Sequence, residues 1–404
     1  MSAYKWQFVP RFRRQAFGWR SDTPIQRIKE AVSEIKQVAR KDPVLAVDGA
    51  VRFLEKISGA LEHVDSSSGA IGAAVNRAIA SLAPIIGGTE VDHVTRHRWL
   101  ERLWNAIQND DMPYIEGLTD YWGELCRAPE LASAWADEFI PIVERVLSPQ
   151  ASGHGHFKGT NACLSALFAA QRYEELLGLL AKARFKYWGE RRWGVKALAA
   201  MGQKAEAIRY AEDSKGLNAP LSTIAETCEE ILLSSGLYEE AYSRYALLAN
   251  QGMTHLATFR AIAKKYPRKL PADILRDLVA SQPGAEGKWF AAAKDVGLFD
   301  LAIELVLRSP TDPRTLIRAA KEFAVNRPDF AVESGMAALR WISRGHGYEI
   351  TGFEVQEAYA AVMQAAREAG IDEGRVRDDI GHLIAATRHG SNLLRTALTR
   401  YFPE

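Results

Sequence analysis

The 404-residue sequence has only three cysteines, and they lie far apart. Such a small, scattered set predicts neither a disulfide framework nor a zinc site with the usual ligand spacing, and it favours a reducing compartment. The first 20 residues contain no apolar run of signal-peptide length. The most apolar segment, 68–88, contains Asn76, Arg77 and Pro84, so we expect a buried helix there rather than a membrane span. The sequence therefore predicts a cytoplasmic protein without membrane contact.

Signatures of catalysis and of cofactor binding are missing as well. The sequence contains no nucleophile elbow, P-loop or dinucleotide fingerprint. His93 and His97 are four residues apart, but the glutamate that a zincin helix places after the first histidine is a valine here. His154 and His156 supply two ligands, and the sequence indicates no third or fourth. We expect no cofactor, no metal ion and no enzymatic activity.

Apolar residues recur at helical spacing along nearly the whole chain. One stripe runs through Ile25, Ile28 and Val32, whereas the strict alternation typical of strands is scarce. The pattern predicts an all-α protein. The longest polar, glycine-rich break, at 148–156, predicts a boundary between an N-terminal helical subdomain, 1–147, and a second domain, 160–404.

Beyond this break a short pattern repeats four times, in which a turn residue is followed by an acidic residue and, in three of the four copies, by an alanine. The aligned turn positions are Gln171, Gly202, Gly236 and Gly297, with gaps of 31, 34 and 61 residues. The last gap equals two units of about 30 residues. A glycine ends a helix readily because it adopts the left-handed conformation, and an acidic residue suits the first turn of the next helix. Since one helix hairpin cannot bury its apolar face alone, the pattern predicts a stack of hairpins.

The turns at Gly236-Leu237-Tyr238 and at Gly297-Leu298-Phe299 resemble the inter-helix turn of the tetratricopeptide family, and the resemblance covers roughly 165–310. It implies an α-solenoid that binds another protein on its concave face. The family's early tryptophan has no match here, so a HEAT-like array stays open. The whole chain also resembles a group of uncharacterised bacterial helical-repeat proteins, most clearly across 40–80, which implies no mechanism.

The densest cluster of aromatic and basic residues in the repeats lies at 184–193. Such clusters anchor protein partners, because aromatic and arginine side chains contribute most of the binding energy at interfaces. We expect an unknown protein partner to bind at this cluster. Alternatively, its tryptophans fill the groove between helices. The predicted partner-binding residues are Tyr187, Trp188, Arg191, Arg192 and Trp193.

The N-terminal arm is strongly basic, with ten Lys and Arg against three Asp and Glu in 1–41. Its cations alternate with aromatic residues, a combination that suits single-stranded nucleic acid. The alternative function is therefore a nucleic-acid-binding helical-repeat protein that uses this arm together with 184–193. In the competing interpretation the aromatic residues pack on the first helices, and the arginines face water or the acidic stretch 110–144. The candidate residues are Trp6, Arg11, Arg13, Arg14 and Arg20.

The acidic stretch 110–144 contains nine Asp and Glu and one cation. Glu116, Asp120 and Glu124 are spaced by four, which would place three carboxylates on one helix face. That arrangement could hold a divalent cation or perform acid–base chemistry, and a hydrolase is a third hypothesis. The competing interpretation is a solvated or charge-paired face.

Overall fold

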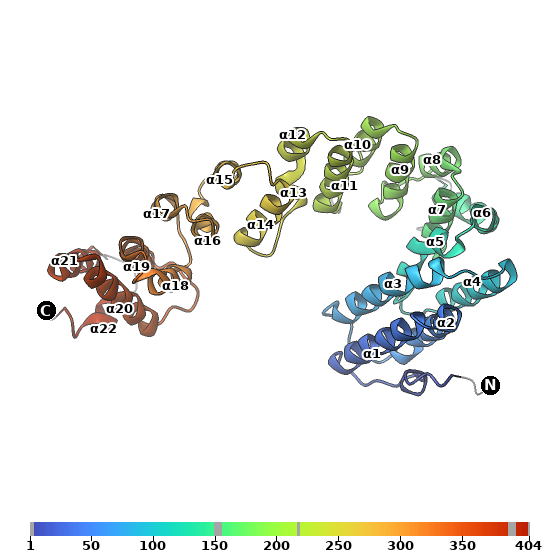
Figure 1. Cartoon of the computed structure of the whole chain (residues 1–404), viewed down its shortest axis with the longest axis horizontal. Coiled ribbons are helices and arrows are strands. Elements are labelled where there is room, and N and C mark those ends of the chain that lie inside the picture. Colours follow the sequence, from blue (N-terminus) through green and yellow to red (C-terminus); the bar gives the residue numbers. More distant parts are fainter. Residues whose placement is uncertain (1–3, 149–155, 216–218, 387–392, 403–404) are drawn as a thin grey trace. The chain divides into compact units, whose positions relative to one another are not determined.

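The chain, described by a computed structural model for residues 4–148, 156–215, 219–386 and 393–402, consists of helices and connecting loops, with no strand in these ranges (Figure 1). The predicted all-α class is therefore confirmed. Two compact units divide the chain, Met1–Pro220 and Leu221–Glu404. The break at 148–156, where we predicted a boundary, lies within the first unit, and its residues 149–155 are outside the described ranges.

The first unit begins with a short 3-10 helix, and a second one precedes the short helix α5. Its elements are η1 (Val9–Arg11), α1 (Asp22–Ala39), α2 (Pro43–Ala60), α3 (Ala70–Gly88), α4 (His93–Gln108), η2 (Glu116–Tyr121), α5 (Trp122–Cys126), α6 (Pro129–Leu147), α7 (Thr160–Ala169), α8 (Tyr173–Ala181), α9 (Trp188–Ala200) and α10 (Lys204–Glu212).

The second unit contains one helix, α12 to α13, that is interrupted by a π-helical turn. Its elements are α11 (Leu221–Ser234), α12 (Tyr238–Ala241), η3 (Tyr242–Ala246), α13 (Leu247–Ala249), α14 (His255–Lys265), α15 (Pro271–Ala280), η4 (Glu286–Trp289), α16 (Phe290–Asp295), α17 (Phe299–Arg308), α18 (Pro313–Phe323), α19 (Pro328–Ser343), α20 (Gly352–Ala369), α21 (Glu373–Ala385) and α22 (Leu393–Leu398).

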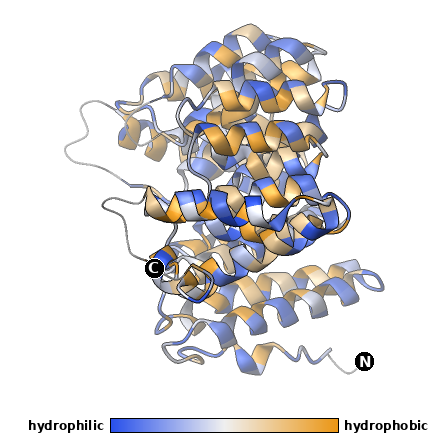
Figure 2. Ribbon diagram, turned by 90° about the vertical axis from the view of Figure 1, so that its left-hand side faces the viewer, coloured by the Kyte–Doolittle hydropathy of each residue, from blue (hydrophilic) through white to orange (hydrophobic). Residues whose placement is uncertain are grey.

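Within each unit several helices pack against their neighbour in sequence and against the helix after that. In the first unit α7 contacts α8 and α9, and in the second α18 contacts α19 and α20. Hydrophobic and hydrophilic residues alternate around the helices (Figure 2), because each helix buries one stripe and exposes the other. The core is therefore built from the periodic apolar residues that the sequence indicated, among them Ile28 and Ile35, which are 2% and 0% exposed.

Helix α3 meets the length and composition criteria for a membrane span, and it is the one helix of the described ranges that does so. Half of its apolar window is nevertheless buried inside the protein. Ile71, Val75 and Leu82 are fully buried, and α3 packs against α1, α2 and α5. Residues Ala70–Gly88 of this segment thus form a helix with one side packed inside the first unit.

Four inter-helix turns share one backbone conformation. The residues Gln171, Gly202, Gly236 and Gly297 have φ values of 59°, 80°, 75° and 75°. The residue after each has φ between −87° and −83° and ψ between 55° and 64°. Its N–H donates to the carbonyl five residues earlier at 2.9–3.0 Å, which is a Schellman ending. The prediction of left-handed glycines at helix ends is therefore confirmed, and Gln171 adopts the same conformation without being a glycine.

The residues that follow these turns also behave as predicted. Acidic residues occupy the first turn of α8, α10, α12 and α17. The alanines Ala207, Ala241 and Ala302 are fully buried, so a larger side chain there would separate the paired helices.

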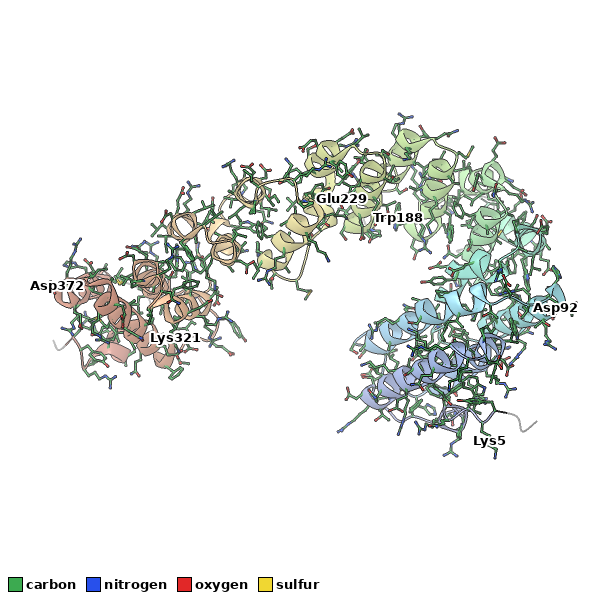
Figure 3. All side chains as sticks on the ribbon, viewed as in Figure 1. Lys5, Asp92, Trp188, Glu229, Lys321 and Asp372 are labelled. Carbon is green, nitrogen blue, oxygen red and sulfur yellow. The ribbon has the colours of Figure 1, made fainter. Side chains whose placement is uncertain are left out.

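A fully buried carboxylate joins three segments of the second unit. Glu229, labelled on α11 in Figure 3, is 0% exposed. It accepts hydrogen bonds from Asn250 Nδ2 at 2.8 Å, Lys265 Nζ at 2.5 Å and the Tyr266 hydroxyl at 2.6 Å. These hydrogen bonds connect α11 to Asn250 after α13 and to the end of α14, so the cluster holds these segments together.

Candidate functional site

The aromatic residues of the N-terminal arm lie in the core of the first unit. Trp6, Phe8 and Phe12 are 5%, 3% and 1% exposed. The rings of Phe8 and Phe12 stand edge-on to Phe53 of α2, with centroids 5.7 Å and 5.1 Å away. Stacking of a nucleic-acid base on Trp6 would therefore require the arm to detach. In contrast, Trp19 is 72% exposed.

The arginines of the arm are divided between ion pairs and solvent. Arg11 pairs with Glu30 of α1 at 2.9 Å, and Arg14 pairs with Glu62 at 3.1 Å. Arg13 and Arg20 are exposed. Within the part of the chain that the structure describes, the ion pairs of these arm arginines thus involve carboxylates of α1 and of the turn after α2, and not those of the stretch 110–144.

In the cluster 184–193, neighbouring residues lie in opposite environments. Trp188, labelled at the start of α9 in Figure 3, Arg191 and Trp193 are 7%, 8% and 4% exposed. Tyr187, by contrast, is 65% exposed, and Phe185 is 58% exposed. The surface of the cluster is therefore formed by the residues that precede α9, and the two tryptophans pack beneath it.

Two of the three arginines of this cluster, Arg191 and Arg192, make hydrogen bonds and ion pairs inside the first unit. The Arg191 guanidinium donates to the Ser214 hydroxyl at 2.6 Å and lies 3.7 Å from the ring centroid of Tyr210. Arg192 pairs with Asp120 and donates to the Gly189 carbonyl. These contacts fix the start of α9 against η2 and α10.

The acidic stretch pairs with the helices that follow it. Asp120 pairs with Arg192, Asp137 with Arg172 and Glu144 with Lys182. Residues Glu116–Tyr121 form a 3-10 helix before the α-helix Trp122–Cys126. The expectation of three carboxylates on one α-helical face is therefore wrong, because the helix type changes between Asp120 and Glu124.

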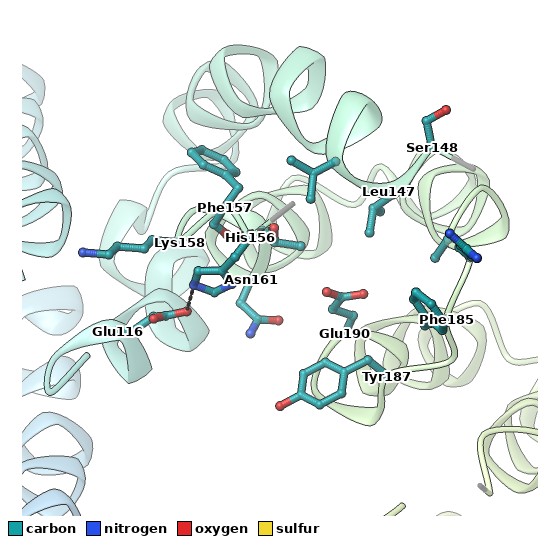
Figure 4. Close-up of a pocket in the computed structure, with 14 residues that line it drawn as sticks. Glu116, Leu147, Ser148, His156, Phe157, Lys158, Asn161, Phe185, Tyr187 and Glu190 are labelled. Atoms are coloured by element: carbon teal, nitrogen blue, oxygen red, sulfur yellow. Dashed lines mark hydrogen bonds and ion pairs between the residues drawn. The ribbon is translucent and has the colours of Figure 1, made fainter. Parts of the chain in front are cut away.

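Residues from three of these sequence features meet at one pocket of about 370 Å³ in the first unit (Figure 4). It lies between the end of α6, the start of α7 and the start of α9. We call it the Glu190 pocket. The side chains that define it are Glu116, His156, Asn161, Phe185, Tyr187 and Glu190.

The carboxylate of Glu190 points into this space, with Phe185 and Tyr187 beside it in Figure 4. Burial raises the pKa of Glu190, while the nearby His156 acts in the opposite direction. Glu190 is half-buried, and its carboxylate makes no hydrogen bond or ion pair with another described side chain, so the charge of His156 offsets its desolvation only in part. The Oδ1 atom of Asn161 is also buried without a donor from the described residues. The pocket thus offers two acceptors that receive no hydrogen bond from the side chains that the structure describes.

Glu116, His156 and Lys158 beside the pocket have polar partners, whereas Arg184, which also lines it, is exposed and lies near an aromatic ring. His156 Nε2 lies 3.1 Å from Glu116 Oε1. The Lys158 ammonium donates to the carbonyls of Ile107 and Asp110 at the end of α4. The Arg184 guanidinium lies 5.2 Å from the ring centroid of Phe185. An incoming cation with several N–H donors would therefore find Glu190 and Asn161 as its partners.

The other candidate reactive groups are poorly placed for chemistry. Burial raises the pKa of the Cys126 and Cys163 thiols to about 12, so neither is a thiolate near neutral pH. His97 lies 3.4 Å from Glu101 and its ring stacks with His93. Within the described ranges, no group of three or more His, Cys, Asp or Glu is placed to hold a metal ion. His154 lies outside those ranges.

Sequence reasoning found the segments of the Glu190 pocket but did not join them. Glu116 belonged to the acidic stretch, His156 to the polar break and Tyr187 to the aromatic cluster. Asn161 and the role of Glu190 were missed, because no spacing rule connects residues so far apart in sequence. The copy of Tyr121-Trp122-Gly123-Glu124 at 187–190 was the one available signal.

Comparison with known proteins adds no further constraint on this site. No model of a known protein family matches the chain, and no curated protein matches it.

Proposed function

We propose that the protein is a cytoplasmic, non-enzymatic interaction protein, that its helices form a tetratricopeptide-like α-solenoid, and that it binds another protein through the Glu190 pocket. The four turns of one conformation support a repeat architecture. Stacked hairpins require a helix to contact its next two neighbours, as α7 and α18 do. The buried thiols of Cys126 and Cys163 agree with a reducing compartment.

The observation that carries the binding proposal is the position of the Glu190 carboxylate, which lies in a pocket beside the exposed ring of Tyr187 and has no hydrogen-bond or ion-pair partner among the described side chains. A lysine or arginine side chain of the partner would restore the missing donors, and its cation would be attracted to the face of Tyr187. A hydrogen bond to a charged group contributes about 1.5–3 kcal/mol, which corresponds to roughly ten- to a hundredfold in affinity. The partner segment is therefore expected to be basic.

This proposal keeps the region first expected to bind a partner, but it changes the parts that individual residues play. Tyr187 contacts the partner. Trp188, Arg191 and Trp193 hold α9 in place from beneath, and Arg192 connects it to Asp120. Substitution of the buried tryptophans would therefore damage the unit itself, and it would be a poor test of binding.

The test uses a phage-displayed library of random peptides, selected in parallel on the wild-type chain and on Glu190→Gln. Peptides enriched on the wild type are expected to carry Lys or Arg at a fixed position. Their affinity is expected to fall at least about tenfold for Glu190→Gln and for Tyr187→Ala. The matched control is Tyr348→Ala, which removes a tyrosine that is 79% exposed and belongs to the other unit, and it should bind as the wild type does.

Enrichment of acidic peptides, or equal binding of the basic peptides to Glu190→Gln, would contradict the proposal. The nucleic-acid alternative is examined in the same format with labelled single-stranded DNA and RNA. Because counterions are released from phosphates, true nucleic-acid binding weakens steeply with salt. If these oligonucleotides bind tightly, if their affinity falls steeply with salt, and if no peptide is enriched, nucleic-acid binding becomes the function in place of protein binding.

A further inference from the structure

A second concave surface lies in the first unit, between α1 and α3, well apart in sequence from the Glu190 pocket. Its volume is about 500 Å³. Ile28, Ala74 and Ala78 form a buried floor, and Val32 and Ser81 are half-buried at its sides. The floor is therefore apolar and, on the α3 side, made of small residues. We call it the α1–α3 groove.

Four cations surround this floor: Lys29, Lys36 and Arg40 come from α1, and Arg77 comes from α3. All four are exposed, and none makes an ion pair with another described residue. No described residue that lines the groove carries a carboxylate. Most other arginines of the unit are compensated, as shown by Arg102, which pairs with both Asp48 and Glu55. The groove is thus a concentrated positive surface.

None of the three carboxylates of α1 lines the groove. Asp22 lies at the start of the helix, and Glu30 and Glu34 have partners outside the groove. Glu30 pairs with Arg11 and Arg27, and Glu34 accepts hydrogen bonds from the backbone N–H groups of Gln7 and Phe8. The N-terminal arm therefore occupies the acidic side of α1 and leaves the basic side to the groove. Acidic and basic residues thus lie on different sides of α1. The acidic side binds the N-terminal arm, and the basic side forms one wall of the groove.

We propose that the α1–α3 groove binds an acidic amphipathic helix of a partner protein. The lining residues on α1 recur from Ile28 to Arg40, which corresponds to about 18 Å at 1.5 Å per residue, the length of about three helical turns. The small side chains of Ala74 and Ala78 allow a second helix to approach closely. Leucine or isoleucine residues of the partner would contact Ile28 and Val32, and flanking Asp or Glu would meet the four cations.

The chemistry of the groove favours this occupant over other anions. The groove lining contains no aromatic side chain among its described residues, so single-stranded nucleic acid would find nothing on which to stack its bases. A duplex would bring no apolar surface to cover Ile28 and Val32. A flat membrane would not follow a concave floor, whereas a helix with one apolar face and two acidic edges matches both the shape and the charge.

The experiment measures fluorescence polarisation with a labelled helical peptide of roughly 15 residues, long enough to span the groove. The peptide carries a leucine stripe bordered by glutamates, and a second peptide has lysine at every glutamate position. The wild-type chain is expected to bind the glutamate peptide at least about tenfold more tightly, because the lysine peptide meets like charges. Raising the salt concentration should weaken this preference.

Two variants test the location of binding. The charge-reversed double variant Lys36→Glu and Arg77→Glu should bind the glutamate peptide at least about tenfold more weakly and should prefer the lysine peptide. Ser33→Trp fills the groove from its exposed rim, and it should weaken both peptides. Lys41→Glu removes an exposed cation just beyond α1 that does not line the groove, and it should bind as the wild type does. Circular dichroism checks that the helical content of each variant is unchanged.

Several results would overturn the proposal. These are equal affinity of the wild type for both peptides, an effect of Lys41→Glu as large as that of the double variant, and unchanged binding in Ser33→Trp. Phosphatidylserine vesicles or labelled single-stranded DNA that bind the groove in place of the peptide would assign it to another anion. A wild-type dimer that the double variant abolishes in sedimentation would assign it to a second copy of this chain. None of these results depends on the Glu190 pocket.

Discussion

Detachment of the N-terminal arm is the perturbation whose magnitude the structure defines best. Trp6 is 95% buried and packs over Gly49 of α2 so closely that a Cβ atom added at Gly49 would overlap its indole ring. Burial of a tryptophan removes about 150–250 Å² from water, which corresponds to about 4–6 kcal/mol at about 25 cal/mol per Å². Substitutions of buried aromatic residues by alanine cost about 3–5 kcal/mol. We therefore expect Trp6→Ala to lower the free energy of unfolding of the first unit by about 3 kcal/mol or more.

The contact between Trp6 and Gly49 also predicts that Gly49→Ala changes stability in opposite directions in the wild type and in Trp6→Ala. In the wild type, Gly49→Ala should destabilise by about 1–3 kcal/mol, because the methyl group overpacks against the indole ring. In Trp6→Ala the space is open, and Gly49→Ala should stabilise by up to about 1 kcal/mol through its better helix propensity. Urea unfolding followed by circular dichroism measures all four chains, and hydrogen exchange reports whether the arm is protected.

The control for this cycle lies in the same arm. Trp19 is 72% exposed, so Trp19→Ala should change stability by less than about 0.5 kcal/mol. If Gly49→Ala stabilised the wild type as much as it stabilised Trp6→Ala, the indole ring would not lie over Gly49. The arm would then be free, and its aromatic residues would again be available to a nucleic acid.

Two further predictions concern a turn and a titrating carboxylate. Gln171 and Gly202 occupy equivalent left-handed positions. In thermal unfolding, Gln171→Gly should therefore raise the free energy of unfolding by about 0.5–1 kcal/mol, and Gly202→Ala should lower it by about 1–2 kcal/mol. Changes of the same sign in both variants would refute the equivalence of the two positions. Hydrogen bonds from Thr351 and Arg314 lower the pKa of Glu354 to about 2. Because the unfolded chain then takes up the proton first, the stabilisation is complete above pH 4.5 and is lost as the pH falls towards 2. Glu354→Gln should therefore destabilise the second unit at pH 7, and unfolding curves from pH 7 down to pH 2.5 should show the difference shrinking; a constant difference would contradict this account.

Local features of the fold were predictable from the sequence because they depend on neighbouring residues. Apolar residues at helical spacing indicated helices, and Gly202, Gly236 and Gly297 indicated helix ends in the left-handed conformation. Both signals act within one or two helical turns. The boundary at 148–156 was a weaker inference, since a polar break describes a loop equally well, and α6 and α7 pack against each other on either side of it.

The candidate sites were predictable only as segments. Adjacent residues in one basic-aromatic cluster differ in exposure, as Tyr187 and Trp188 do, and the sequence contains no measure of which of them faces another helix. The groove cations Lys29, Lys36 and Arg40 recur at a helical period and could have been noticed as a stripe. Their partner Arg77 could not, because it comes from a different helix.

The sequence by itself determined that this chain is helical, where four of its helices end, and that its N-terminal region is rich in positive charge. Only the tertiary structure decided which charges are compensated. In the folded chain Arg14 forms an ion pair with Glu62, and Arg192 forms one with Asp120. Glu190 in its pocket and Arg77 at the α1–α3 groove form no such pair with a described residue. The physical reason is that hydrogen bonding and periodicity along a helix are local, whereas the energy of a charge depends on what the packing of distant helices brings within a few ångströms.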